Sequence, residues 1–167
     1  GSIGDFCCHS FNMPVRALNL KYPSKVKISN VEKAGLETYA KTVTHTFHFP
    51  AEGKRAAVNL IYYTGGADMP PKHITDQLVG TFGNIPRVGA IIEGENGLLS
   101  SGLWNSQCYL KLKDDKKFIG HGNHGEAKKV AQTLPRANGH FREWIDAIIN
   151  NGKTFASFDI GGHLTEI

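Results

Sequence analysis

The sequence predicts an α+β fold in which one large, mostly antiparallel, open-faced β-sheet carries helices on one face. Two observations support this prediction. Segments 42–49 and 55–64 alternate in side-chain character from one residue to the next, which is typical of strands with one buried face. Segment 139–151 instead repeats its apolar residues at helical spacing. The chain has 167 residues, enough for a hydrophobic core, and we expect 1–167 to be a single domain.

The first half of the chain is expected to form one helix and then three strands. The helix covers 4–19. Pro14 lies inside it and predicts a kink or a second start, for which Asn12 is the candidate N-cap. The strands are expected at 25–32, 42–49 and 55–64. Gly65-Gly66 ends the third of them.

The second half of the chain is expected to add a hairpin, further strands and helices. Asn96-Gly97 predicts a tight turn between strands at 89–93 and 98–101, because Asn-Gly supplies positive φ at low cost. The other segments are a loop with a short helix at 72–86, a strand at 107–113, an exposed excursion at 114–138, a helix at 139–151 ended by Gly152, a short strand at 154–158 and a helix beginning at 161–167.

Composition and charge narrow the class of protein. The net charge is +4, but the lysines are scattered, whereas nucleic-acid binding calls for a concentrated basic stripe with stacking aromatics. No segment reaches the roughly 20 apolar residues of a membrane span. The three cysteines form no disulfide framework and are expected to be buried apolar residues in a reducing compartment, which favours a cytoplasmic location over export.

The chemistry-bearing residues of the first helix are Asp5 and His9. They lie four residues apart, so both project from one helix face. A carboxylate beside an imidazole holds the ring in one tautomer and suits a histidine that transfers protons. The same spacing also fits a surface pair in which Asp5 favours the helix dipole, and the spacing alone does not choose between the two.

Four sequence motifs follow one another along the chain. They are Gly4-Asp5-x-x-x-His9-x-x-Asn12, Leu60-Ile61-Tyr62-Tyr63-Thr64-Gly65-Gly66, Ala90-Ile91-Ile92-Glu93-Gly94-Glu95-Asn96-Gly97 and Gly139-His140-Phe141-Arg142-Glu143-Trp144-Ile145-Asp146-Ala147-Ile148. Together they resemble the C-terminal domain of the Gfo/Idh/MocA oxidoreductases, whose sheet is of the type seen in the C-terminal domain of glyceraldehyde-3-phosphate dehydrogenase. Two positions depart from that pattern: Asn12 and Thr64 stand where relatives have Asp.

The resemblance implies a substrate-binding and oligomerisation domain of an NAD- or NADP-dependent enzyme that acts on a sugar, a polyol or a derivative. It makes His9 the catalytic histidine and Asp5 its partner carboxylate. The cofactor would belong to an N-terminal Rossmann domain, for which this sequence has no fingerprint. We therefore expect no cofactor-binding residues here, and neither nicotinamide binding nor turnover by this chain alone. A piece of a longer protein would explain the helix that begins at 161–167.

Further polar residues are candidates for binding the hydroxyls of a sugar. Asn12, His140 and Arg142 are the ones we expect, although His140 equally fits a helix cap. Trp104 fits either stacking on a sugar or closing a loop. No metal site is expected: His45 and His48 lie on opposite faces of one strand, and His121 and His124 lie in what the pattern indicates is a solvated glycine-rich loop.

The open sheet face predicts a homo-oligomer. If two such faces pair, the aromatic residues of the strands should form an exposed apolar patch or a dimer interface; these are Phe47, Phe49 and Tyr62 or Tyr63. A second function class stays open, namely a stand-alone, non-catalytic carbohydrate-binding or assembly module of the same fold. The expected partners are thus a small sugar or polyol, a Rossmann domain and a second copy of the chain, with no nucleic acid and no membrane.

Overall fold

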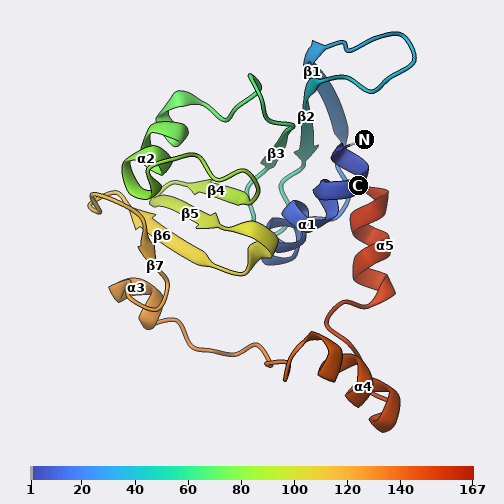
Figure 1. Cartoon of the computed structure of the whole chain (residues 1–167). Coiled ribbons are helices and arrows are strands. Elements are labelled where there is room, and N and C mark those ends of the chain that lie inside the picture. The colour runs from blue at the N-terminus through green and yellow to red at the C-terminus, as the bar shows by residue number, and fades with distance from the viewer. Residues whose placement is uncertain (1) are drawn as a thin grey trace.

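The α+β class is confirmed, but the strands form two sheets. The computed structural model describes residues 2–167, apart from the side chain of Leu103 (Figure 1). The helices are α1 (Ser2–Ala17), α2 (Lys72–Phe82), α3 (Gly125–Lys128), α4 (His140–Asn150) and α5 (Phe158–Glu166), with a 3₁₀ turn η1 (Leu103–Asn105). The strands are β1 (Lys25–Glu32), β2 (Thr42–Phe49), β3 (Val58–Tyr63), β4 (Ala90–Gly94), β5 (Gly97–Ser101), β6 (Cys108–Leu112) and β7 (Ile119–Gly120).

The sheets have the orders β1-β2-β3 and β4-β5-β6-β7, with antiparallel neighbours throughout. The expectation of one large sheet is therefore not met. Between β3 and β4 the chain makes a turn at Gly65–Asp68 and then forms α2, so the two strands belong to separate hydrogen-bonded ladders. Both sheets keep unpaired edge strands, so neither closes on itself.

The first sheet follows the alternation in the sequence. The bounds of β1 and β2 agree with the predicted segments, whereas β3 is shorter than the predicted 55–64. The reason is a tight turn in which the backbones of Glu52 and Arg55 bond to each other at 3.0 and 2.9 Å, so Arg55 cannot join the ladder. The first core lies between this sheet and α1, and its buried members are Cys7, Phe11, Val15, Leu20, Phe47, Phe49, Leu60 and Tyr62.

This first core corrects the predicted interface patch. Phe47, Phe49 and Tyr62 are buried beneath α1 instead of being exposed. Tyr63 lies on the opposite face of β3 and is half-buried. The alternation predicted the two faces of the strands, but it did not say which face this chain's own helix covers.

The second core packs α2 on the β4–β7 sheet. Its buried members are Ile74, Leu78, Leu98 and Phe118. The predicted hairpin is confirmed, with Gly94 paired to Gly97 and Glu95-Asn96 between them. Of the Asn-Gly pair, Gly97 has positive φ (151°).

Helix ends differ from the predictions at several places. Pro14 sits inside the single helix α1, so no second helix starts at Asn12. The segment assigned mostly to a loop forms the 11-residue α2, which ends at Gly83 in the left-handed conformation. Asn151, not Gly152, takes the left-handed position after α4, and 154–158 is not a strand.

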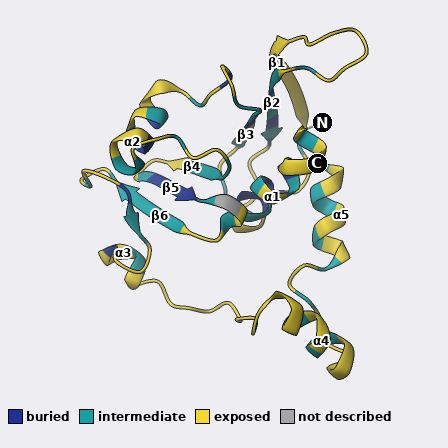
Figure 2. Ribbon diagram, in the orientation of Figure 1, coloured by how far each residue is buried: buried dark blue, intermediate teal, exposed yellow. Residues whose placement is uncertain are grey.

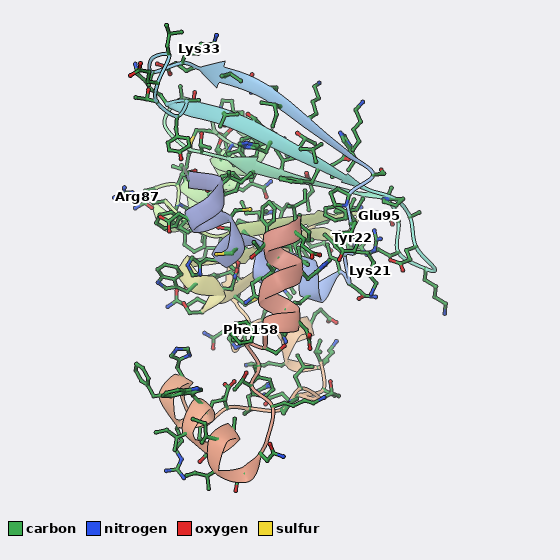
Figure 3. All side chains as sticks on the ribbon, turned by 90° about the vertical axis from the view of Figure 1, so that its right-hand side faces the viewer. Lys21, Tyr22, Lys33, Arg87, Glu95 and Phe158 are labelled. Atoms are coloured by element: carbon green, nitrogen blue, oxygen red, sulfur yellow. The ribbon has the colours of Figure 1, made fainter. Side chains whose placement is uncertain are left out.

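The two C-terminal helices have different surroundings. α5 lies along α1 and is tied to the segment that follows α1: the His163 ring bonds the carbonyl of Leu20 at 2.9 Å, and Tyr22 donates to Glu166 at 2.7 Å (Figure 3). α4 carries an exposed apolar stripe and stands apart from both sheets (Figure 2). Among the described residues, no helix combines the length and apolar character needed to cross a bilayer.

Candidate active site

α1 brings Asp5, His9 and Asn12 to one helix face. The opposite face of the helix is anchored in the first core by Phe11 and Val15, both 3% exposed. Asp5 and His9 are exposed and Asn12 is half-buried. A rigid, well-packed helix thus holds these three polar side chains at the surface, as a binding or catalytic constellation requires.

The His9 ring has an aromatic neighbour in place of the expected carboxylate. Among residues 2–167, no hydrogen bond or ion pair joins Asp5 to His9. The ring of His9 instead meets the indole of Trp104 edge-on, with centroids 4.4 Å apart and planes at 87°. Phe6 extends this aromatic group, since its ring stacks with Trp104 at 6.4 Å and 17°. Sequence reasoning named Trp104 without placing it here.

The contact depends on η1, which its last residue, Asn105, ties to α1 and to β5. The Asn105 amide donates to the carbonyl oxygen of His9 at 2.6 Å, and its oxygen accepts from the Ser101 hydroxyl at 2.7 Å. Its backbone N–H bonds to Gly102 at 3.0 Å. One side chain therefore ties the end of β5 to α1 and sets the position of Trp104 over the His9 ring.

Trp104 adopts a backbone conformation that bulky residues avoid. Its φ is 57° and its ψ 21°, in the left-handed region, and Asn105 follows with φ 53°. For a residue other than glycine this conformation costs about 1–3 kcal/mol. The side chain is still 54% exposed, so core burial does not offset the cost. Strain of this kind clusters at functional sites.

Asn12 has unused hydrogen-bonding capacity one helical turn from His9. Its amide oxygen is buried and has no partner among the described residues. An unsatisfied buried acceptor costs about 1–3 kcal/mol. Asn12 lies one helical turn from His9 on the same helix face. Because its oxygen is buried, a ligand beside the imidazole bonds to that oxygen only if the side chain turns outward.

The structure does not bring His140 and Arg142 to α1. Both lie on α4, away from α1 in Figures 1 and 3. Arg142 pairs with Asp146 along the helix at 2.8 Å. His140 does not cap α4, because the N-cap is Gly139, with no side-chain hydrogen bond. The candidate site thus keeps three of its five predicted residues together.

A buried histidine replaces the expected solvated loop before α3. His124 is 5% exposed, and its Nδ1 accepts from the backbone N–H of Glu126 and Ala127 at 3.1 and 3.4 Å. Its Nε2 faces Asp115 at 2.9 Å. The hydrogen bonds from His124 and from the Leu112 backbone lower the pKa of Asp115. His124 thus caps α3, and Asp115 holds its ring in place. The described residues contain no group of three or more potential metal ligands.

The first sheet holds a second polar network that the sequence did not indicate. Buried Asp68 accepts from the Thr44 hydroxyl at 2.5 Å, and the amide of Asn30 reaches the Thr44 hydroxyl at 3.0 Å. The Thr64 backbone N–H also points at Asp68, at 3.4 Å. These contacts fix the Gly65–Asp68 turn, so their role is to hold the end of β3.

His45 should make the fold sensitive to acid. It stacks beside Phe47 on the face of β2 under α1, and its Nδ1 is buried without a described partner. Burial lowers the pKa of His45, against a smaller opposing effect of Asp68. In the unfolded chain His45 binds a proton near pH 6.5, whereas in the folded chain it binds that proton only at a lower pH. The contribution of neutral His45 to the free energy of unfolding is therefore fully present above about pH 6.5. It is lost as the pH falls below that value.

The measurement is the free energy of unfolding between pH 5 and pH 8. The His45→Phe variant keeps a flat ring in the core but cannot titrate, so it should lose less stability on acidification than the parent chain. Equal pH slopes for the two proteins would contradict this prediction.

No family model, no curated protein and no solved structure matches this chain. The functional argument therefore rests on the residues and their geometry.

Proposed function

We propose that this chain is the substrate-binding and oligomerisation domain of an NAD- or NADP-dependent oxidoreductase of the Gfo/Idh/MocA type, acting on a sugar, a polyol or a derivative. The observation that carries the proposal is the grouping of Asp5, His9 and Asn12 on one face of α1, with Trp104 against the His9 ring. The four sequence motifs and the α+β class support it, whereas the division of the strands between two sheets departs from the single large sheet that the resemblance implies.

In this proposal His9 accepts the proton of the substrate hydroxyl that is oxidised. Its ring is exposed enough to meet a ligand, and Trp104 restricts its movement on one side. Asp5 lies one turn away on the same face, and its role in this proposal is that of a nearby negative charge. No hydrogen bond joins the two side chains in the described residues. Asn12 offers the N–H end of its amide to a neighbouring hydroxyl, since its amide oxygen is buried.

The dinucleotide does not fit the residues described here. Every strand pair is antiparallel, so residues 2–167 contain no parallel βαβ unit of the kind that binds NAD or NADP. The cofactor, which supplies the hydride acceptor, would be held by a separate Rossmann domain.

A different sheet face supports the oligomerisation role. Ile92, Leu99 and Leu110 pair directly across β4, β5 and β6, on the face of the second sheet turned away from α2. All three are only half-buried. A row of apolar side chains across three strands is a surface that a second copy can cover.

The test is calorimetric titration of the chain with NAD, NADP, sugars and polyols, for the parent and for His9→Ala. We expect binding of a sugar or polyol, weakened at least about tenfold in His9→Ala, and no nucleotide binding. Light scattering on the same sample should report a dimer or larger assembly, and Leu99→Lys should shift it towards the monomer. Tight nucleotide binding, or the absence of any sugar or polyol binding, would overturn the proposal.

The second candidate is a non-catalytic carbohydrate-binding or assembly module of the same fold. The absence of an Asp5–His9 hydrogen bond among the described residues favours it, as do Asn12 and Thr64 at positions where relatives have Asp. Sugar binding that survives His9→Ala unchanged would select this candidate over the oxidoreductase domain.

A further inference from the structure

Trp104 is the residue whose geometry the fold explains least and a ligand would explain best. Its backbone is in the left-handed region, its indole is half exposed, and its ring lies 4.4 Å from that of His9. A tryptophan that only closed a loop would be expected to be buried, yet this one is half exposed. A left-handed position in a turn would be expected to hold glycine or asparagine, yet it holds tryptophan.

The surrounding contacts hold the indole in place without covering it. Asn105 fixes the turn through bonds to His9 and Ser101, and Phe6 packs beside the indole. The result is a flat apolar surface next to the imidazole of His9, with Asn12 one helical turn further along the same face of α1. Such a mixed surface, apolar with a few placed polar groups, is typical of sites for small polar ligands.

We propose that Trp104 makes this site select sugars in the six-membered ring form over open-chain polyols. This inference rests on the proposed function and names the substrate class of the same site. A pyranose ring has a flat face of C–H groups that covers an indole, while its hydroxyls point outward, where the neighbouring His9 ring can bond one of them. An extended polyol has no such face, so it forms the polar contacts but gains little from the indole.

The sequence provides a clean reporter for this contact. It contains only two tryptophans, and Trp144 lies on α4, which stands apart from α1. In a Trp144→Phe background, the fluorescence of Trp104 reports ligand contact directly. The probes are methyl β-D-glucopyranoside, which cannot open, and D-glucitol, its open-chain counterpart.

The deletion variant is Trp104→Gly, because glycine adopts a φ of 57° without strain and the turn should remain folded. Trp104→Phe keeps a smaller aromatic face and serves as the conservative variant. We expect the pyranoside to change the Trp104 emission. We also expect Trp104→Gly to weaken pyranoside binding about tenfold and glucitol binding by much less, with Trp104→Phe in between.

An unchanged ratio of the two affinities in Trp104→Gly would overturn this inference while leaving the proposed function standing. Trp104 emission that does not change when the pyranoside binds would also overturn this inference and leave the proposed function standing. If neither probe nor any other sugar or polyol binds the parent chain, the proposed function fails and this inference fails with it.

Discussion

Replacing Phe11 by alanine is expected to remove about 3–5 kcal/mol from the free energy of unfolding. Phe11 is 3% exposed and lies at the centre of the first core. Its ring meets those of Phe47 and Tyr62 edge-on, with centroids 5.4 and 5.9 Å away. Truncation leaves a cavity between α1 and the sheet, and both aromatic contacts are lost. Urea unfolding followed by circular dichroism measures the change.

Phe158→Ala is the matched control, because it deletes the same ring where that ring is 99% exposed. It should change the stability by no more than about 0.5 kcal/mol. A Phe11→Ala variant as stable as Phe158→Ala would mean that α1 is not packed on the sheet as described. That result would also remove the basis for the site, since the same helix presents His9.

The elements that could be predicted from the sequence are those with a local signal. Alternation predicted the bounds of β2, and the Asn96-Gly97 pair located the hairpin. α2 was assigned mostly to a loop because only Ile74 and Leu78 mark its buried side, which is too weak a period in isolation. Its helical state depends on the second sheet, which the helix covers.

Non-local contacts explain the remaining differences of the fold. Which strands share a sheet, and which face a helix covers, are decided between segments far apart in the chain. Phe47 and Tyr62 have the same alternating pattern whether they meet α1 or a second copy. The pattern of α4 likewise predicted a helix correctly, yet its apolar side is covered by neither sheet of this chain.

The candidate site divides in the same way. The spacing of Asp5, His9 and Asn12 on a helix follows from the sequence alone. The placement of Trp104 does not, because it depends on a bond between Asn105 and His9, which are 96 residues apart, and on a left-handed backbone at a bulky residue. No local rule predicts positive φ at a tryptophan, so the indole beside His9 becomes visible only in three dimensions.

Gly97→Ala is expected to cost about 3 kcal/mol or more, through a clash that cannot relax. A Cβ at this position would lie 2.2 Å from the carbonyl oxygen of Lys111 and 2.8 Å from the Cα of Leu112. Both are backbone atoms of β6, which pairs with β5 at this point. The φ of 151° adds strain for any residue with a side chain. The alanine must therefore push β5 away from β6.

Gly94→Ala is the control from the same hairpin. Its added Cβ would come no closer than 3.9 Å, to the carbonyl oxygen of Gly97, and its φ is not positive. The two variants therefore change the same residue type across one turn, and only Gly97→Ala forces backbones together. Urea unfolding should give free energies of unfolding that differ by at least about 2 kcal/mol between the two variants, with Gly94→Ala near the parent. Equal losses in both variants would show that the cost comes from glycine flexibility in the turn, and not from the close approach of β5 and β6.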